Sequence, residues 1–168
     1  MKGLEMEFNT AFGFVPIDKR RTISKPRKSG ITMVSDYQLG LASLSDLIEV
    51  AGHYIDLFKI ATGTSRLFKK THLQAKIKML RTNDIRPFLG GQFQEYVLHT
   101  MGVDAMPRHL GEAQALGFDI IEISDNMVQL GQGLRQQLFD MVRDQGMTPV
   151  GEIGDKRESS SIMSITVS

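Results

Sequence analysis

The stretch FDIIEISDN, residues 118–126, combines a strand-like apolar run with a charge inside it. In a strand, alternate side chains share a face, so Glu122 and Ser124 face one side while Ile121 and Ile123 face the other. A lone carboxylate costs several kcal/mol to remove from water, which makes it rare in an apolar interior. We therefore expect Glu122 to have a partner or a use.

Four further apolar runs predict strands, and segments with helical periodicity lie between them. The strand starts recur about every 25 to 33 residues, which is the length of a strand followed by a helix. This repeat predicts a parallel sheet with right-handed crossovers. The other strands are predicted at 31–34, 54–61, 84–89 and 148–154, and the helices at 43–54, behind a Ser43 cap, at 66–81, in a broken region that Gly117 closes, and at 134–146.

Repeated units of this kind form either an open doubly wound sheet or a closed barrel. A dinucleotide-binding fold would carry G-x-G-x-x-G directly after the first strand, and SDYQLGLASL, residues 35–44, does not supply it. The pattern favours an α/β fold of the parallel (β/α)₈ TIM-barrel type, incomplete, with about five βα units. We divide the chain into a basic lead (1–28), a partial barrel (29–157) and a divergent tail (158–168).

Composition limits the partners and the chemistry. The chain has 168 residues, 41% hydrophobic and 23% charged, with a net charge of +1 and no cysteine. It is long enough for one domain with a real core. Disulfides, thiolate metal sites and thiol catalysis are excluded, and a cytoplasmic location is expected. Neither nucleic acid nor a membrane is an expected partner, because no nucleic-acid module or long apolar run is present.

Charged residues near the ends of three predicted strands indicate a functional site. Lys59, Glu122 and Glu152 each interrupt an apolar run at a similar depth. Carboxyl ends of parallel strands meet on one side of a barrel, where active sites lie, so these side chains should converge. Asp36 and Ser124 lie near strand ends as well. The structural alternative is a solvated rim or a stabilising ion pair.

Two turns and one arginine are candidates for binding an anionic substrate. The turns precede helix starts, where backbone amides and hydroxyls suit a phosphate, although they are also ordinary turns. Arg27 could reach an anionic ligand at the first strand. The four histidines show no metal-binding spacing, and we expect them at the surface or partly packed. The turn residues are Thr62, Gly63, Thr64 and Ser65 in the first turn, and Gly90 and Gly91 in the second.

Four motifs resemble the phosphosulfolactate synthase family. They are KPRKSGITMVSDYQLGL (25–41), YIDLFKIATGTS (54–65), LGFDIIEISDN (116–126) and VGEIGDK (150–156). Their order and separation also match that family, from about Ala11 to Lys156. Asp155 stands where relatives carry a lysine or a serine, and KIATGTS departs from the usual KFGWGTS.

The resemblance implies a (β/α)₈ barrel and a carbon–sulfur lyase. Members add sulfite to phosphoenolpyruvate with Mg²⁺, giving phosphosulfolactate in coenzyme M biosynthesis. Carried over to this chain, Glu122 and Glu152 would bind Mg²⁺ with Asp36 as a third ligand. Lys156 would protonate the substrate carbon and Lys59 would neutralise substrate charge.

Two alternatives remain open, and the chain is short for a barrel. Plant heat-stress-associated proteins resemble the same family without being enzymes, and another phosphate-handling barrel, such as an aldolase or isomerase, would share the fold. A full barrel needs about 250 residues, so we expect a truncated one with uncovered edges. Self-association into a homo-oligomer could cover them, or the strand-like tail SIMSITVS, residues 161–168, could pair on an edge.

Overall fold

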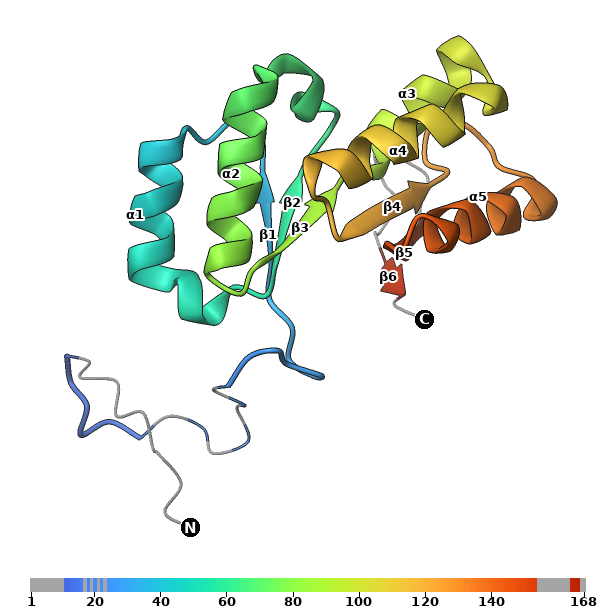
Figure 1. The fold of residues 1–168 in the computed structure, drawn as a ribbon. Coiled ribbons are helices and arrows are strands. Elements are labelled where there is room, and N and C mark those ends of the chain that lie inside the picture. The colour runs from blue at the N-terminus through green and yellow to red at the C-terminus, as the bar shows by residue number, and fades with distance from the viewer. Residues whose placement is uncertain are drawn as a thin grey trace.

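The chain forms one sheet with helices packed on it. The structure, a computed structural model, describes residues 11–153 except Ile17, Lys19, Arg21 and Ile23, together with the backbone of 164–166. Within that part of the chain the sheet has six strands in sequence order, of which β1 to β5 are parallel and β6 is antiparallel to β5. Helices alternate with the parallel strands (Figure 1). The α/β fold expected from the repeat is confirmed.

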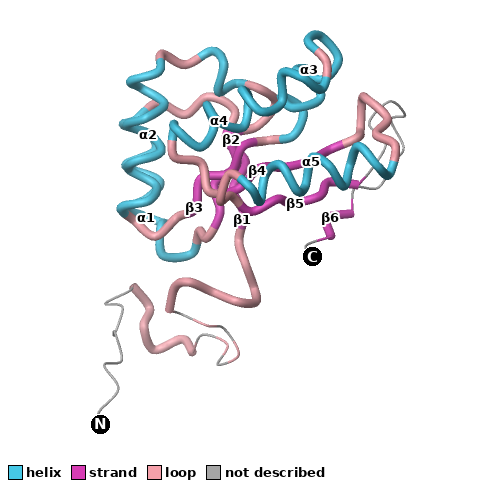
Figure 2. Tube along the Cα trace, turned by 45° about the vertical axis from the view of Figure 1, so that its right-hand side comes forward, coloured by secondary structure: helices cyan, strands magenta, loops and turns pink. Residues whose placement is uncertain are grey.

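The elements follow one another around the sheet, with α1, α2, α4 and α5 in chain order (Figure 2). The strands are β1 (Met33–Asp36), β2 (Leu57–Ile60), β3 (Arg86–Leu89), β4 (Ile120–Ser124), β5 (Thr148–Ile153) and β6 (Ser164–Thr166). The α-helices are α1 (Leu41–Ala51), α2 (Lys70–Thr82), α3 (Gly91–Met101), α4 (Met106–Leu116) and α5 (Gln132–Asp144), and the short 3₁₀ helices are η1 (Gly52–Tyr54), η2 (Thr64–Leu67) and η3 (Val103–Ala105).

The sheet has two apolar faces with separate cores, as expected for barrel strands that are covered by helices outside and by side chains inside. The helix-facing side contributes Ile60, Leu89 and Ile121 to a large core with α2, α4 and α5. On the opposite side Phe88 and Ile120 form a smaller core. Burial on both faces explains the near-continuous apolar runs of the sequence.

Element boundaries differ from the prediction where backbone pairing decides them. β1 begins at Met33 rather than at Ile31, which is 48% exposed. The backbone N–H of Thr32 donates instead to the side-chain carboxylate of Asp56, at 2.9 Å. Likewise α1 begins at Leu41 behind Gly40, without the predicted Ser43 cap. Apolar periodicity locates an element, whereas neighbouring strands and turns set its first residue.

Candidate active site at the carboxyl end of the sheet

Lys59 lies between two buried glutamates that come from other strands. Its Nζ is 2.7 Å from Oε1 of Glu122 on β4 and 4.0 Å from Oε1 of Glu152 on β5. The side chains of Lys59, Glu122 and Glu152 are 12%, 5% and 3% exposed. The structure thus brings the three strand-end charges together on one face of the sheet. The ammonium compensates the burial of the carboxylates, which is how Glu122 is accommodated in an isoleucine-rich strand.

The start of α3 provides the second partner of Glu122. The Gly91 N–H donates to Glu122 Oε2 at 2.6 Å, so the carboxylate lies where the helix dipole favours negative charge. A Cβ built on Gly91 would come within 2.6 Å of Ser124 Oγ and 3.0 Å of Glu122 Cγ. One on Gly90 would lie 3.0 Å from the Ile60 carbonyl oxygen. Both glycines therefore allow α3 to approach the strands, and the Gly91 amide holds Glu122.

Two residues of α3 complete the surroundings of Ser124, and the sequence reasoning missed both. Glu95 is 2% exposed; it accepts the Ser124 hydroxyl and, through Oε2, the N–H groups of Met127 and Val128 at 2.5 and 2.7 Å. Gln94 Oε1 accepts the Ser124 N–H at 3.2 Å. The available signal was GGQFQE itself, because a helix that begins directly after a strand points its first turn at the strand ends.

Asn126, also missed, bridges the β4 loop to β5. Its Nδ2 donates to Glu152 Oε2 at 2.7 Å, and the residue is 1% exposed. In the described part of the chain its Oδ1 is buried without a hydrogen-bond partner, as is Nε2 of Gln94. Buried polar atoms are rarely left unpaired in native proteins, so unmatched ones mark a place for a ligand, an ion or water.

Hard oxygen donors for a cation are present, but the expected third ligand is elsewhere. Glu122, Glu152 and Asn126 Oδ1 are of the type that Mg²⁺ prefers. No cluster of three or more acidic or histidine side chains suited to a metal occurs in the described residues. Asp36 pairs instead with the buried Lys76 of α2 and accepts the Leu39 N–H at 2.7 Å. Asp36 thus belongs to the helix-facing side of β1, which corrects the expectation that it joins the glutamates.

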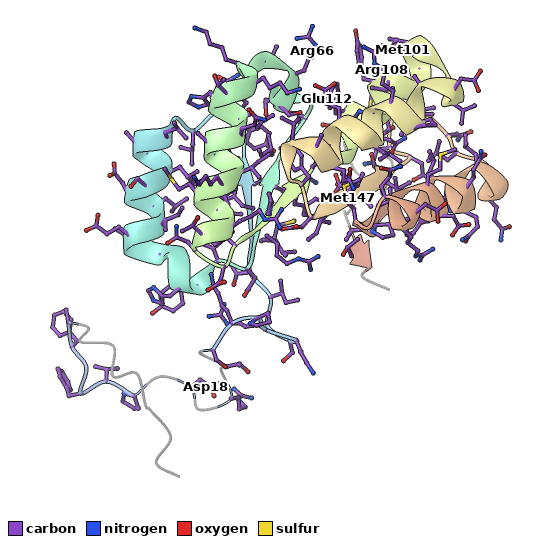
Figure 3. All side chains as sticks on the ribbon, in the orientation of Figure 1. Asp18, Arg66, Met101, Arg108, Glu112 and Met147 are labelled. Carbon is purple, nitrogen blue, oxygen red and sulfur yellow. The ribbon has the colours of Figure 1, made fainter. Side chains whose placement is uncertain are left out.

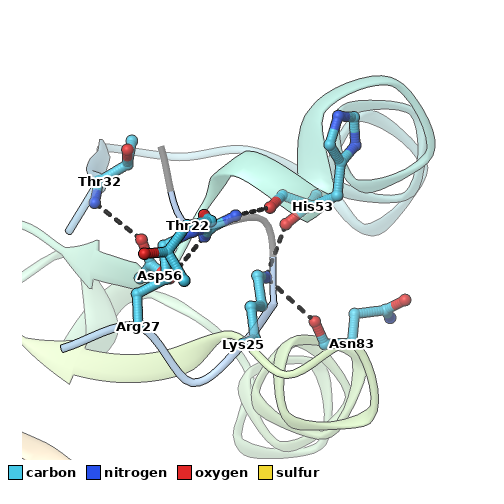
Figure 4. A network of polar contacts seen from close by, with 8 residues as sticks. Thr22, Lys25, Arg27, Thr32, His53, Asp56 and Asn83 are labelled. Carbon is cyan, nitrogen blue, oxygen red and sulfur yellow. Dashed lines mark hydrogen bonds and ion pairs between the residues drawn. The ribbon is translucent and has the colours of Figure 1, made fainter. Parts of the chain in front are cut away.

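Arg27 is held at the opposite end of the sheet. Its guanidinium donates to Asp56 Oδ1 at 2.7 Å and to the carbonyl oxygens of Thr22 and His53 at 2.8 and 2.5 Å (Figure 4). Asp56 immediately precedes β2, so this network lies at the amino ends of the strands. The side chain of Arg27 is only 4% exposed. The prediction was that Arg27 could reach an anionic ligand at the first strand, whereas in the structure its donors hold the N-terminal segment against the sheet.

The turn Thr62–Ser65 follows β2, and in the described part of the chain the ion pairs of Lys59 are with Glu122 and Glu152 rather than with this turn. Thr64 donates its hydroxyl to the Ala61 carbonyl at 2.8 Å, and Gly63 has a positive φ of 75°. Ser65 is buried and faces a cavity among the helices. The turn thus has its own internal hydrogen bond, and its role in binding phosphate stays a prediction. Lys156, predicted as the proton donor, lies outside the described residues.

Sequence comparisons identify the family and several relatives of this chain. Residues 20–167 match the family model of (2R)-phospho-3-sulfolactate synthase (ComA). The chain belongs to the phosphosulfolactate synthase family. It is 36% identical over 132 residues to the phosphosulfolactate synthase of Methanothermobacter thermautotrophicus, covering 79% of this chain and 50% of that one. The protein of the same name from Methanocaldococcus jannaschii is 30% identical, over 76% and 49% of the two chains.

A plant protein is also similar to this chain. Protein HEAT-STRESS-ASSOCIATED 32 of Arabidopsis thaliana is 24% identical over 73% of this chain and 43% of its own length. The chain spans about half the length of the curated phosphosulfolactate synthases that it matches. Phosphosulfolactate synthases are TIM barrels, so the five parallel strands represent the barrel type of α/β fold. In the described segments, every helix is too short or too polar to cross a lipid bilayer.

Proposed function

We propose that this chain contributes to the addition of sulfite to phosphoenolpyruvate, which gives phosphosulfolactate. The observation that carries the proposal is the position of Lys59 between Glu122 and Glu152 at the carboxyl end of the parallel strands. Barrel enzymes place their catalytic groups at this end, and the family supplies the reaction class. Both substrates are small anions, and one ammonium between two carboxylates leaves the cluster with a net negative charge, so a bound cation would be needed to attract them.

In this proposal the residues of the chain hold charge and position. The Lys59 ammonium lies near two carboxylates, which hold it at the site. Its flexible side chain can still direct a donor toward an anionic substrate. Glu122 is fixed by the Gly91 N–H as well. Glu152 is oriented by the amide of Asn126. This arrangement orients an incoming anion without large movement of the protein.

A magnesium ion fits the oxygen donors of the site. Glu122, Glu152 and the unpartnered Oδ1 of Asn126 would hold it, with substrate or water completing the shell. When bound, the ion would stabilise negative charge on the substrate carboxylate as sulfite adds to the methylene carbon. Lys156, four residues after Glu152, is the proposed donor of the proton that the neighbouring carbon gains. The cytoplasmic location stays a prediction.

The test is direct detection of product. The purified chain is incubated with phosphoenolpyruvate, sulfite and Mg²⁺ and followed by phosphorus NMR, alone and with the C-terminal half of a relative appended. We expect the phosphosulfolactate signal in at least one of the two forms. In that form, Glu122→Gln or Lys156→Ala should lower the rate of product formation at least 100-fold, which is the scale for loss of a catalytic group. Glu49→Gln on the exposed face of α1 is the matched control. Absence of product from both forms, or equal rates for Glu122→Gln and Glu49→Gln, contradicts the proposal.

A further inference from the structure

A second hollow lies in the helix layer, away from the ion cluster at the strand ends. It has a volume of about 470 Å³ and lies between η2, the start of α2, and α4. This volume is within the usual range for small-molecule sites, roughly 300–1,000 Å³. Its lining is mixed, and its apolar part is rich in aromatic rings and includes Phe68, Leu73, Leu89, Phe93, Ala113 and Phe118.

Two polar atoms at this cavity have no hydrogen-bond partner among the residues that the structure describes. Ser65 is 8% exposed, and both its Oγ and Nε2 of His109 are buried without a hydrogen-bond partner in the described part of the chain. The imidazole contacts the Phe93 ring edge to face, with centroids 5.0 Å apart. Burial lowers the pKa of His109 from 6.5 to about 4, against a smaller opposing effect of Glu112, so the ring is neutral near pH 7. A hydroxyl and a neutral imidazole can each donate or accept a hydrogen bond.

The mouth of the cavity carries an excess of positive charge. Lys70 Nζ lies 3.6 Å from Glu112 Oε1, so these two charges compensate each other. Arg66 also lines the cavity and is exposed, and its guanidinium has no ion-pair or hydrogen-bond partner among the residues that the structure describes. Figure 3 shows Arg66 at the outer end of η2, with Glu112 of α4 below it. A guanidinium at the rim of an apolar pocket is suited to a carboxylate.

We propose that this cavity binds a small aromatic carboxylate that carries a hydroxyl group. The aromatic ring of the ligand packs against the apolar walls beside Phe93, and its carboxylate pairs with Arg66. Its hydroxyl hydrogen-bonds to Ser65 Oγ and His109 Nε2. One hydroxyl can donate to one of these atoms and accept from the other, which satisfies both. The site is separate from the proposed sulfite chemistry, because Leu89 lines it from the helix-facing side of β3 whereas Lys59 and Glu122 lie on the other face.

The experiment uses three probes that differ by one group each. They are 4-hydroxyphenylacetate, phenylacetate, which lacks the hydroxyl, and 4-hydroxyphenylacetamide, which lacks the charge. Binding is followed by titration calorimetry and by the NMR signals of the His109 ring, without phosphoenolpyruvate, sulfite or Mg²⁺. We expect 4-hydroxyphenylacetate to bind most tightly and to shift the His109 signals. Loss of either group should weaken binding about fivefold to tenfold.

Variants of this chain separate the cavity from the strand-end site. Arg66→Gln should weaken 4-hydroxyphenylacetate about tenfold, and Ser65→Ala about fivefold, because each removes one partner of the ligand. Arg108→Gln is the matched control, since Arg108 is an exposed arginine of α4 that does not line the cavity (Figure 3). Glu122→Gln should bind the probe as the unaltered chain does. The proposal fails if the probe leaves His109 unshifted, if Arg66→Gln and Arg108→Gln bind equally, or if Glu122→Gln abolishes binding.

Discussion

Glu122 is a buried carboxylate with two partners of different kinds. Lys59 supplies a full charge at 2.7 Å, and the Gly91 N–H supplies a hydrogen bond at the positive end of α3. Only proline would remove the Gly91 N–H, and its ring would also disturb the start of α3, whereas the lysine can be replaced without changing the backbone. The lysine therefore offers the clean test of whether the glutamates depend on charge compensation, since its loss leaves Glu122 and Glu152 buried side by side.

Lys59→Met should destabilise the chain strongly. Methionine fills a similar volume but leaves two buried carboxylates without their shared ammonium, and breaking a buried ion pair costs about 3 kcal/mol. The free energy of unfolding is measured in urea at pH 7. Lys78→Met on the exposed side of α2 is the control and should change stability by less than about 0.5 kcal/mol. Equal stability of the two variants would mean that Lys59 does not compensate the glutamates.

Gly91→Ala tests how closely α3 must approach β4. The added methyl would lie 2.6 Å from Ser124 Oγ and 2.9 Å from Ser124 Cβ, so Ser124 and Glu122 must move. We expect a loss of about 1–3 kcal/mol, typical of overpacking in a filled core. The same change at Gly111, where nothing lies within 4 Å, should stabilise α4 by about 0.5–1 kcal/mol. Urea unfolding checks both, and a stabilising Gly91→Ala would contradict the close contact.

Among the elements, α2 is attached to the end of β1 by a buried ion pair. Lys76 of α2 pairs with Asp36, and both side chains are fully buried. The Lys76 ammonium also donates to the Leu39 carbonyl at 2.7 Å and lies 4.7 Å from the centre of the Phe68 ring. A charge in this interior is tolerated only because every partner is present. The pair therefore fixes α2 against the first βα loop.

A double-mutant cycle measures this attachment. Asp36→Asn and Lys76→Met should each cost about 3 kcal/mol, because each leaves one buried charge uncompensated. The double variant should be more stable than the sum of the two losses by about 1–3 kcal/mol. The exposed pair Lys70 and Glu112 is the control cycle, with a coupling below about 1 kcal/mol. Additive losses at Asp36 and Lys76, measured in urea, would show that the pair does not act as a unit.

Element order and the two faces of the sheet were predictable because local pattern encodes them. Alternation inside FDIIEIS, residues 118–124, separates Glu122 from its isoleucine neighbours, and recurring strand starts predict parallel pairing. The contact between Lys59 and Glu122 follows from that topology, because the carboxyl ends of parallel strands lie at the same edge of the sheet. The partner of Asp36 could not be predicted, because Lys76 faces it only through the packing of α2. Glu95 was missed for a similar reason, since its role depends on the angle at which α3 leaves β3.

Global stability should depend on the partly buried imidazole of His109, whose Nε2 is buried and which joins α4 to α3 through the Phe93 ring. Its pKa is lowered from 6.5 to about 4 by burial, while Glu112 on its own helix acts in the opposite direction and Lys70 and Arg66 line the same cavity. The unfolded chain therefore binds a proton more readily than the folded one between these two values. Stability is then full above pH 6.5 and falls as the pH is lowered toward 4.

The size and origin of this loss can be measured with one substitution. A pKa lowered from 6.5 to about 4 corresponds to a loss of at most about 3 kcal/mol of stability, and this loss is complete below pH 4. We expect the unfolding free energy of the unaltered chain to fall between pH 7 and 4 more steeply than that of His109→Gln. Acidic side chains other than Glu112 titrate in the same window but contribute about equally to both proteins, so the difference belongs to His109 and its interaction with Glu112. His99→Gln, at an exposed position of α3, should keep the full slope, and parallel curves for His109→Gln and the unaltered chain would show that the ring is not buried neutral.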